Sequence, residues 1–321
     1  MPEYTSCEWI EHGIVFDCSN IIGSCSHVNP SGGGRPIIKK EYRGEILKWE
    51  ELFEIKNAHR QIFKEGKVLD ECENCLFLTK KNWDEENYID KILLTPWYDC
   101  NSKCCYCYTT KDPHLVEKTQ KYNLVPVIED MIQRNILKKD AVVDFAGGEP
   151  TIFPDFEELL RLFVENDFKR IDIHTNAIKY SKAIEKGITE NKVNILVSID
   201  AGSKEIHEKV KNVKSYDIVW ENLSKYAIAN PDITKLVRTK YIVVPEVNDS
   251  MEEITLWLKK SKDIGIKCVV LNFDSFWLNE NKDNIPQKMY NIIEETLKKV
   301  KDFDMHCDLY AEAREIYERN K

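Results

Sequence analysis

The chain has 321 residues, of which 42% are hydrophobic and 31% charged, as expected for one large globular domain or one plus a small appendage. Asp and Glu exceed Lys and Arg by 55 to 46, and this acidic, scattered charge argues against general nucleic-acid binding. No run approaches the roughly 18–20 apolar residues of a membrane span, and the first residues lack the basic and apolar regions of a signal peptide. We therefore expect a cytoplasmic protein without nucleic-acid or membrane partners.

Residues 1–90 differ from the rest of the chain, because they combine five cysteines with one convincing helix, "KWEELFEIKNAHRQIFKEG", at 48–66. Before this helix, "GIVFDCSNIIGSC" at 13–25 has the pattern of a hairpin in which a polar turn joins two short strands. We interpret residues 1–90 as a small cysteine-rich domain.

From residue 91 onward, short apolar runs alternate with longer amphipathic segments. Six runs are candidate strands: 91–97, 141–146, 170–175, 194–200, 235–244 and 267–273. Helical patterns between them indicate crossovers, so the strands should form a parallel sheet. Six units are two short of a closed (β/α)8 barrel. The pattern predicts an α/β fold, a partial (β/α)6 TIM-type barrel over 91–275, with its ligand site at the C-terminal strand ends.

The last stretch, 276–321, is predicted to be a helical extension, with one long helix and a second one after it.

Eleven cysteines are unusual in a reducing compartment, where thiols more often bind metals or catalyse than form disulfides. Two of them, Cys268 and Cys307, stand alone and are expected to be small buried hydrophobic residues. The other nine fall into three groups: Cys7, Cys18 and Cys25; Cys72 and Cys75; Cys100, Cys104, Cys105 and Cys107.

The third group follows the first barrel strand, where Cys100, Cys104 and Cys107 form C-x3-C-x2-C. Three thiolates in eight residues can bind three corners of a metal cluster and leave the fourth metal open. Zinc is the alternative, but structural zinc takes four protein ligands and catalytic zinc more often recruits His or carboxylate. Iron–sulfur clusters prefer cysteine throughout.

The second barrel strand ends in "FAGGEPT", in which Gly147 and Gly148 allow the backbone to approach a ligand closely. Glu149 is then expected to face the same end of the barrel as the cysteine loop. Taken alone, the motif is equally typical of a plain strand-to-helix turn, and its place one unit after the cysteine loop favours the functional interpretation.

With these motifs, residues 91–275 resemble the radical S-adenosylmethionine (SAM) enzyme superfamily. The resemblance rests on "CNSKCCYC", "GGEP", "TNA" after the third strand and "VSIDAGSKEIHEKVK" after the fourth. The last segment is similar to that of the branch with peptide-modifying and molybdopterin-type members.

The resemblance implies that Cys100, Cys104 and Cys107 hold a [4Fe–4S] cluster whose open iron binds the amino and carboxylate groups of SAM. It also implies further SAM-binding residues: Gly147, Gly148 and Glu149 at the methionine amino group; Ser198 and Asp200, with Asn176 nearby, along the methionyl–ribose part; and Tyr106 beside the cluster near the adenine. A flavodoxin- or ferredoxin-type protein would donate the electron.

Two positions depart from the family pattern. Related members often carry arginine four residues after the histidine of the fourth segment, where this chain has Lys211, a point charge instead of a bidentate fork. Either Lys211 binds the SAM carboxylate, or Lys240 on the fifth strand does. Cys105 adds a fourth thiol to the loop and is expected to face away from the cluster.

Cys72 and Cys75, in "CENC", supply two ligands and need two more. Antiparallel pairing in the hairpin returns Cys25 toward Cys7 and leaves Cys18 at the distant turn, so we predict a site of Cys7, Cys25, Cys72 and Cys75. Zinc and an auxiliary [4Fe–4S] cluster both suit four thiolates. Resemblance to the SPASM and Twitch auxiliary-cluster domains favours the cluster, although those domains usually follow the barrel.

The sequence thus predicts a radical SAM enzyme that abstracts hydrogen from its substrate and modifies a peptide or protein side chain. Radical modification of a sugar or another small metabolite is the alternative, and a non-catalytic zinc-binding interaction protein is the alternative from another class. Substrate, product, oligomeric state and substrate-facing acid or base are not predicted.

Overall fold

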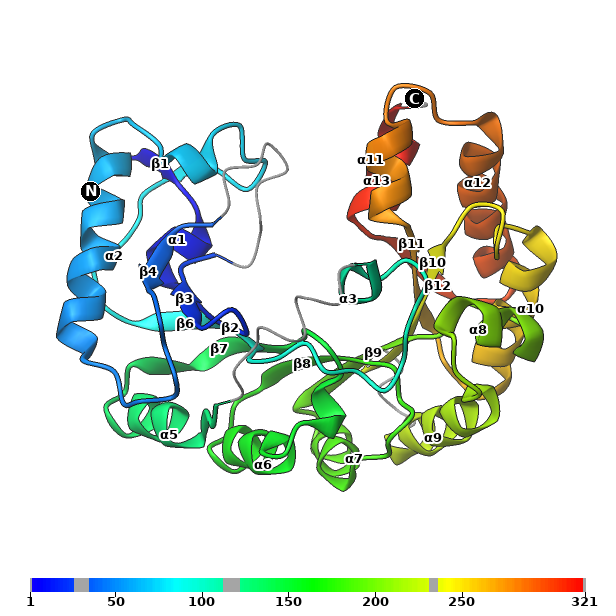
Figure 1. Ribbon diagram of the computed structural model, residues 1–321, viewed down its shortest axis with the longest axis horizontal. Coiled ribbons are helices and arrows are strands. Elements are labelled where there is room, and N and C mark those ends of the chain that lie inside the picture. The colour runs from blue at the N-terminus through cyan, green and yellow to red at the C-terminus, as the bar shows by residue number, and fades with distance from the viewer. Residues whose placement is uncertain (1, 26–34, 112–121, 231–235, 320–321) are drawn as a thin grey trace. The chain divides into compact units, whose positions relative to one another are not determined.

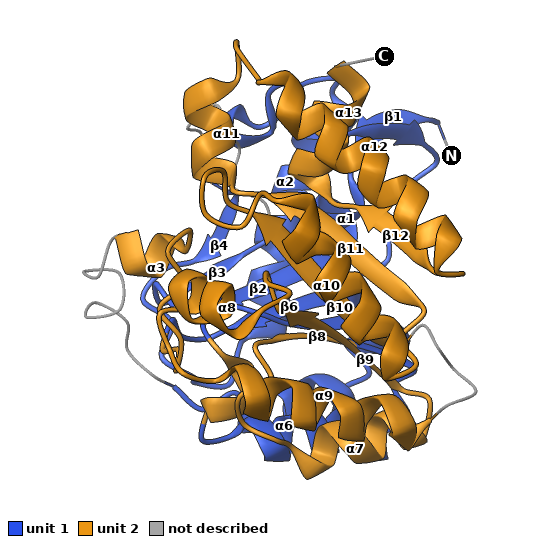
Figure 2. Cartoon of the chain, turned by 90° about the vertical axis from the view of Figure 1, so that its right-hand side faces the viewer, with its two compact units in different colours: residues 1–98, 115–148, 154–171 blue, residues 99–114, 149–153, 172–321 orange. Residues whose placement is uncertain are grey.

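The computed structural model describes residues 2–25, 35–111, 122–230 and 236–319. Contacts divide the chain into two compact units, which Figure 2 shows in blue and orange. Unit 1 contains residues 1–98, 115–148 and 154–171, and unit 2 contains residues 99–114, 149–153 and 172–321. These units divide the chain at residues other than 90 and 275, and the functional division at those two residues stays a prediction.

Unit 1 is built on a five-stranded run of sheet with the order β7-β6-β2-β3-β4. Its elements are β1 (Tyr4–Ser6), α1 (Glu8–His12), β2 (Gly13–Asp17), β3 (Ile21–Gly23), β4 (Ile37–Lys39), α2 (Trp49–Lys64), the 3-10 turn η1 (Asp70–Cys72), β5 (Thr79–Lys81), β6 (Ile89–Thr95), α5 (Val125–Gln133), β7 (Leu137–Phe145) and α6 (Phe156–Glu165). Strand β6 pairs in parallel with β7 on one side and with β2 on the other. Strands β1 and β5 form a separate antiparallel pair.

The predicted N-terminal hairpin is confirmed, because β2 and β3 pair antiparallel with Val15 opposite Gly23 and Asp17 opposite Ile21. Through β2, this hairpin extends the sheet beyond the first barrel strand. The cysteine-rich segment and that strand therefore share one sheet.

Unit 2 contains the parallel run β12-β11-β10-β9, with β8 next in order. Its elements are α3 (Tyr108–Lys111), the 3-10 turn η2 (Pro150–Ile152), β8 (Arg170–Thr175, whose first two residues belong to unit 1), α7 (Lys182–Thr189), β9 (Val193–Ser198), α8 (Lys204–Lys211), α9 (Tyr216–Ala229), β10 (Val237–Val243), α10 (Met251–Asp263), β11 (Cys268–Phe273), α11 (Ser275–Asn281), α12 (Gln287–Asp302), β12 (His306–Leu309) and α13 (Ala311–Arg319). Helices α7, α9, α10 and α12 lie along one side of these strands (Figure 1).

The predicted α/β fold class, with its mostly parallel sheet and its alternation of six barrel strands with helices, is confirmed. Strand β8 has the predicted bounds, and β6, β7, β9, β10 and β11 each overlap the predicted run. The exclusively helical character predicted for 276–321 is wrong, because β12 lies between α12 and α13 and pairs in parallel with β11. Its sequence, "HCDL", has one fully buried side chain, that of Cys307, so it carries little hydrophobic pattern.

Helices in unit 2 begin at side-chain caps that the sequence supplies. The hydroxyls of Ser181, Ser203 and Ser250 each accept a hydrogen bond from a backbone N–H in the first turn of α7, α8 and α10. Helix α8 ends at Asn212, whose left-handed conformation stops the helix after Lys211. The end of α8 positions the cysteine loop described below.

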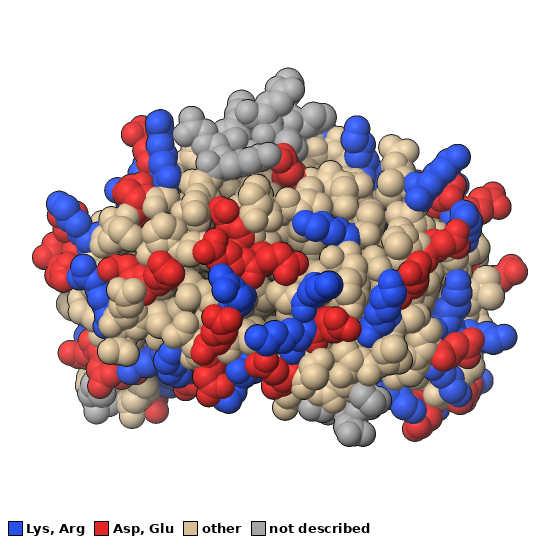
Figure 3. Space-filling model, turned by 90° about the horizontal axis from the view of Figure 1, so that it is seen from below, with Lys and Arg blue, Asp and Glu red and all other residues tan. Residues whose placement is uncertain are grey.

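On the face of the molecule shown in Figure 3, Lys and Arg side chains lie among Asp and Glu side chains, and neither sign gathers into a large patch. Within the described ranges, no helix combines the length and the apolar composition that crossing a membrane requires. The absence of nucleic-acid and membrane partners, and the cytoplasmic location, stay predictions.

Candidate functional site

The cysteine loop of unit 2 is held against the C-terminal end of α8. The backbone N–H groups of Lys103 and Cys105 donate to the carbonyls of Lys211 and Val210 at 3.0 and 2.9 Å. The Ser102 hydroxyl donates to the same Lys211 carbonyl at 3.1 Å. Since the last carbonyls of a helix have no partner within the helix, α8 provides ready acceptors for this loop.

The three predicted cluster ligands lie close enough together to act on one another electrostatically. Burial is the main cause that raises the pKa of the Cys100 thiol to about 11; Glu149, Cys104 and Cys107 contribute to this increase, and the Ser102 N–H opposes it. A polar group also lies beside each sulfur: the Ser102 N–H donates to Cys100 Sγ at 3.4 Å, the Ser102 hydroxyl lies 3.4 Å from Cys104 Sγ, and the Thr109 hydroxyl lies 3.1 Å from Cys107 Sγ.

These thiols therefore suit an iron–sulfur cluster. The half-buried sulfurs repel one another as thiolates and need a cationic metal partner, and hydrogen bonds to sulfur are one means by which proteins tune cluster potentials. Three cysteines leave one iron without a protein ligand. Cys105 is exposed, and its orientation away from the cluster stays a prediction.

The glycine loop lies at the junction of the units in the chain, with Gly147 and Gly148 in unit 1 and Glu149 in unit 2. Gly147 has a φ of +106°, and an added Cβ would lie 2.9 Å from the Trp97 carbonyl oxygen, so glycine is required there. The Gly148 N–H donates to that carbonyl at 3.2 Å.

Glu149 is buried, and its carboxylate accepts four hydrogen bonds. Oε1 accepts from the Thr151 hydroxyl at 2.6 Å, the Thr151 N–H at 3.2 Å and the Thr175 hydroxyl at 2.6 Å. Oε2 accepts from the Asn176 N–H at 2.7 Å. Burial raises the pKa of Glu149 against the effect of these donors. Oε2 thus keeps a lone pair available for a cationic group.

Asn176 joins this carboxylate to the cysteine loop. Its side-chain amide donates to Asn101 Oδ1 at 2.6 Å and lies 3.7 Å from Cys100 Sγ. The structure therefore brings together Glu149, Asn176 and Cys100, which the sequence places in three separate motifs.

Asp200 is the centre of a second buried group. Its Oδ2 accepts from the Tyr106 hydroxyl at 2.6 Å and pairs with the Lys211 ammonium, which also donates to that hydroxyl at 3.1 Å. Burial alone would lower the pKa of Lys211, but Asp200 and then the Cys104 thiol raise it above its ordinary value, so the lysine is charged. Burial and Asp200 raise the pKa of Tyr106, so the phenol is protonated.

Asn248, which the sequence interpretation missed, supports Asp200. Its amide donates to the Asp200 carbonyl at 2.8 Å and the Ile242 carbonyl at 2.9 Å, and its Oδ1 accepts from the Val244 N–H at 2.6 Å. The Ile242 N–H in turn donates to Asp200 Oδ1 at 2.7 Å. A left-handed φ of +58° at Asp200 persists because these contacts fix it. No local pattern connects Asn248 with Asp200, because the two residues are 48 positions apart in the sequence.

Ser198 and Lys240 are neighbours on β9 and β10, where they are paired in register. Both are half-buried, and Lys240 is also within electrostatic range of Asp200 and Lys211. The two lysines that the sequence left as alternatives therefore differ in position. Lys211, at the end of α8, pairs with Asp200, whereas Lys240 lies on β10, opposite Ser198 of β9.

In unit 1 the predicted N-terminal ligands also gather. Burial, together with Cys7, Cys25 and Cys75, raises the pKa of the Cys72 thiol to about 12. Cys7 and Cys72 share one hydrophobic cluster with Ile10 and Phe63. Cys18 lies at the hairpin turn, where burial and Asp17 dominate its raised pKa.

Within the described parts of the chain, no three His, Cys, Asp or Glu side chains converge on a point that one metal ion would occupy. Four cysteine ligands of a [4Fe–4S] cluster bind four different irons, so their sulfurs are spread more widely than the ligands of one ion. The identity of the ligands stays a prediction.

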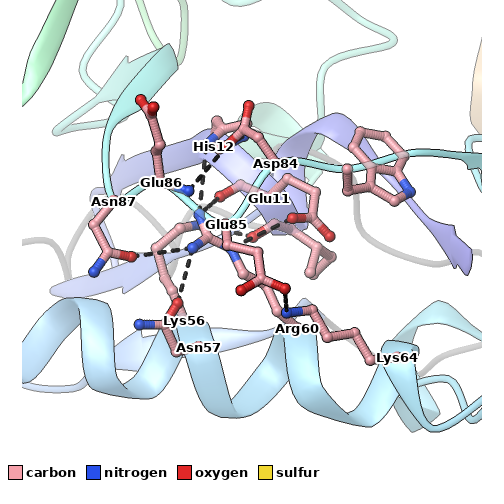
Figure 4. Close-up of polar contacts among 12 residues, drawn as sticks. Glu11, His12, Lys56, Asn57, Arg60, Lys64, Asp84, Glu85, Glu86 and Asn87 are labelled. Atoms are coloured by element: carbon pink, nitrogen blue, oxygen red, sulfur yellow. Dashed lines mark hydrogen bonds and ion pairs between the residues drawn. The ribbon is translucent and has the colours of Figure 1, made fainter. Parts of the chain in front are cut away.

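A buried charged network lies beside these cysteines on α1 and α2 (Figure 4). The Lys56 ammonium donates to the carbonyls of Ile10 at 3.0 Å and Gly13 at 2.8 Å, at the end of α1. Arg60 lies 3.4 Å from the Glu11 carboxylate and donates to the Glu11 carbonyl. Cys7 caps the other end of α1, where its sulfur accepts from the Ile10 N–H at 3.4 Å. This helix is thus held at both ends.

Comparison with known proteins shows to which family this chain belongs. Residues 94–258, just over half of the chain, match the model of the Radical SAM superfamily. The mycofactocin maturase MftC of Mycobacterium tuberculosis is 23% identical over 151 residues, which are 45% of this chain and 37% of that protein. A probable GTP 3',8-cyclase of Saccharolobus islandicus is 24% identical over 186 residues, 57% of this chain and 56% of that protein.

Among solved structures, Streptococcus suis SuiB bound to SAM matches 81% of this chain and 56% of that chain, with a TM-score of 0.52 and 14% identity. The enzyme anSMEcpe with bound SAM and the Kp18Cys peptide matches 68% of this chain and 63% of that one, with a TM-score of 0.51 and 20% identity. These likenesses support the fold. The chain spans little more than a third of the mycobacterial relative's length.

Proposed function

We propose, from the premise that this chain belongs to the Radical SAM superfamily, that it cleaves SAM reductively and uses the resulting 5′-deoxyadenosyl radical to abstract hydrogen from a peptide or protein side chain. The predicted family is confirmed, and with it the type of enzyme and its requirement for a [4Fe–4S] cluster and SAM. The observation that supports the proposal is that Cys100 lies near Cys104 and Cys107 and also near Glu149 and Asn176.

Cys100, Cys104 and Cys107 would hold the cluster, which supplies the electron for SAM cleavage. Glu149 would accept the amino group of SAM on Oε2, the oxygen that receives one hydrogen bond from the described residues. Gly147 and Gly148 would let the backbone approach the same group.

For the carboxylate of SAM, Lys211 is favoured over Lys240. The Lys211 ammonium has three protons and uses two of them on Asp200 and Tyr106. Electrostatic interactions with Cys104 and Cys100 support a position of Lys211 beside the proposed cluster ligands. Its third proton is therefore available to a carboxylate at the open iron, with a single contact in place of the bidentate one that arginine makes.

Asp200, with Ser198 and Asn176 nearby, would contact the methionyl and ribose part of SAM. Tyr106, which donates to Asp200, would lie beside the cluster near the adenine. These roles come from the family resemblance, and the hydrogen bonds around Asp200 support them because they orient its carboxylate before SAM binds.

A peptide substrate is supported by the relatives. One is named a maturase, and SuiB and anSMEcpe have each been solved with a peptide. The likeness to a probable GTP 3',8-cyclase supports a small-molecule substrate as the second candidate. Family membership speaks against the non-catalytic zinc-binding alternative.

The N-terminal group of Cys7, Cys25, Cys72 and Cys75 would hold an auxiliary [4Fe–4S] cluster, and a flavodoxin- or ferredoxin-type protein would deliver electrons. The mutual electrostatic effect of these four thiols supports the first proposal.

Anaerobically reconstituted and reduced protein should convert SAM to 5′-deoxyadenosine and methionine. Changing Cys100, Cys104 and Cys107 together to Ala should abolish the reaction, whereas Cys105→Ala, which removes an exposed thiol of the same loop, should retain it. Undiminished cleavage in the triple variant would refute the site. Deuterium transfer into 5′-deoxyadenosine from labelled peptides, but not from labelled GTP or sugars, would separate the two substrate classes.

A further inference from the structure

Strand β10 presents two cations on the face that α10 does not cover. The side chains of Thr239 and Tyr241 point to α10, where the Thr239 hydroxyl lies 3.0 Å from that of Ser261 and the Tyr241 ring packs 5.1 Å from Trp257. Because side chains alternate along a strand, Arg238 and Lys240 lie together on the opposite face. Both are half-buried there, between buried neighbours.

Both cations have donors without acceptors. Among the described residues, none accepts a hydrogen bond from the Lys240 ammonium or forms an ion pair with it. The Nε of Arg238 is buried and likewise has no acceptor there. One ion pair reaches the guanidinium, from Asp308 at 3.8 Å, which is long for a hydrogen-bonded pair.

His174, on β8, faces the same two cations. Burial, together with Lys240 and Arg238, lowers the pKa of His174 to about 3, so the imidazole is neutral. Burial likewise lowers the pKa of Lys240, and Lys211 adds to this, against the opposing effect of Asp200. The face therefore has a positive potential that nearby protein groups reduce only in part.

The acidic side chains around this face are already engaged or partly exposed. Glu312 accepts a hydrogen bond from Asn272 at 2.7 Å, and Asp200 pairs with Lys211. Asp308 is 46% exposed. Leaving buried donors unsatisfied is unfavourable, and more so for charged groups. An anionic ligand is the partner that would satisfy Arg238 and Lys240 together.

We propose that Arg238 and Lys240, with His174 beside them, bind a carboxylate of the peptide substrate, either an acidic side chain or the C-terminus. The proposal rests on the proposed peptide-modifying function and names its substrate class. A carboxylate has two oxygens, so one can accept from the partly exposed Arg238 guanidinium and the other from Lys240. Lys240 is paired in register with Ser198, so this carboxylate would be held next to the residues assigned to SAM.

The test measures peptide binding by isothermal titration calorimetry to reconstituted holoenzyme with SAM and without reductant. The probes are three pentapeptides: Ac-Gly-Gly-Glu-Gly-Gly-NH2, the same peptide with Gln, and the Gln peptide with a free C-terminal carboxylate. The Glu peptide or the free-acid peptide should bind about tenfold or more tightly than the blocked Gln peptide, as the loss of one charge-assisted hydrogen bond implies. Which of the two binds distinguishes a side chain from a C-terminus.

Arg238→Met and Lys240→Met should each remove this tenfold preference, whereas Lys259→Met, an exposed lysine of α10, should keep it. Arg238→Lys retains the charge and should keep part of the preference. This variant tests the proposal even if the Met variants do not fold. Equal binding of Glu and Gln peptides, or unchanged preference in both Met variants, would overturn the proposal. Pyrophosphate that displaces every peptide and binds more tightly would assign the site to a phosphorylated small molecule instead. The binding experiment contains no reductant, so its result does not depend on whether the protein cleaves SAM.

Discussion

Replacing Lys56 with Met removes an ammonium whose hydrogen bonds hold the end of α1. The side chain of Lys56 is fully buried, and its donors lie 3.0 Å from the Ile10 carbonyl and 2.8 Å from the Gly13 carbonyl. Met has a similar length and shape but donates no hydrogen bond. The two carbonyls would stay buried without a partner, because α1 and β2 remain packed around them.

The cost follows from these contacts. Each buried carbonyl without a donor costs about 1–3 kcal/mol, and the two together about 2–6 kcal/mol. Removing the buried Lys56 ammonium, which lies near the Arg60 guanidinium, offsets part of this free-energy cost, because burial of the ammonium was itself unfavourable. We expect a net loss of about 2–4 kcal/mol in the free energy of unfolding.

The effect should also depend on pH. Burial, together with Arg60, lowers the pKa of Lys56 from 10.5 to about 7. Between pH 7 and 10.5 the unfolded chain therefore binds a proton that the folded chain does not bind, so wild-type stability gains from Lys56 as the pH rises. The neutral amine still donates to both carbonyls, and the difference between wild type and Lys56→Met should be larger at pH 9 than at pH 6.

Urea unfolding of anaerobic protein, followed by tryptophan fluorescence at pH 6 and pH 9, measures both effects. Lys64→Met is the matched control on α2, because Lys64 pairs with the exposed Glu85 at 2.6 Å and should contribute less than about 1 kcal/mol (Figure 4). If Lys56→Met unfolds at the same urea concentration as Lys64→Met, or if its effect does not grow with pH, the assigned role of Lys56 is wrong.

Three further predictions concern other sites. Cys18→Ala should leave about eight irons per chain, which are two clusters of four, whereas Cys75→Ala should reduce the iron content toward four. Iron analysis with Mössbauer spectra measures this content. Four irons plus one zinc in the wild type would refute an auxiliary iron–sulfur cluster. Burial lowers the pKa of His207 to about 4, so cluster-free protein should lose up to about 3 kcal/mol of stability as pH falls from 6.5 to 4, and His207→Gln should lose less; equal slopes in urea titrations would contradict this. Asn248→Ala leaves two carbonyls and one N–H near Asp200 without partners, so we expect a loss of about 2–4 kcal/mol and a raised KM for SAM; a KM that does not change would separate Asn248 from the site.

The barrel strands were predictable because their hydrophobic patterns are strong. Strand β8 alternates Ile171, Ile173 and Thr175 on its buried face, and its bounds followed from the sequence. Strand β7 starts at Leu137, four residues before the predicted start. The prediction missed this first part because Lys138, Lys139 and Asp140 are exposed polar residues. The end of a strand that is exposed to solvent has no apolar pattern in the sequence that would predict it.

The α2 network shows a different limit of pattern reasoning. The buried face of α2 contains Trp49, Leu52 and Phe63 at helical spacing, but Lys56 and Arg60 occupy the same face. A polar residue at such a position is ordinarily expected to be exposed, and its burial depends on carbonyls and a carboxylate from α1 that only the folded chain brings to it.

The candidate site was predictable wherever its residues belong to one local motif. The cysteine loop and the glycine loop each carry their spacing in a few residues, and the structure brings Cys100 and Glu149 together as their positions after neighbouring strands implied. Asn101, Thr175 and Asn248 were not predicted, because their importance lies in hydrogen bonds to residues more than twenty positions away or in another loop.

Asp200 connects these parts of unit 2. Its carboxylate joins Tyr106 of the cysteine loop to Lys211 of α8, and its other oxygen accepts the backbone N–H of Ile242 on β10. Ile242 and Lys240 are two residues apart, so they lie on the same face of that strand. A shift of β10 that followed the binding of a substrate carboxylate to Lys240 would therefore act on Asp200 through one hydrogen bond. Asp200, assigned to SAM, and Lys240, assigned to the substrate, are thus connected through β10, and this gives the order of binding of the two molecules a physical basis that calorimetry in either order can measure.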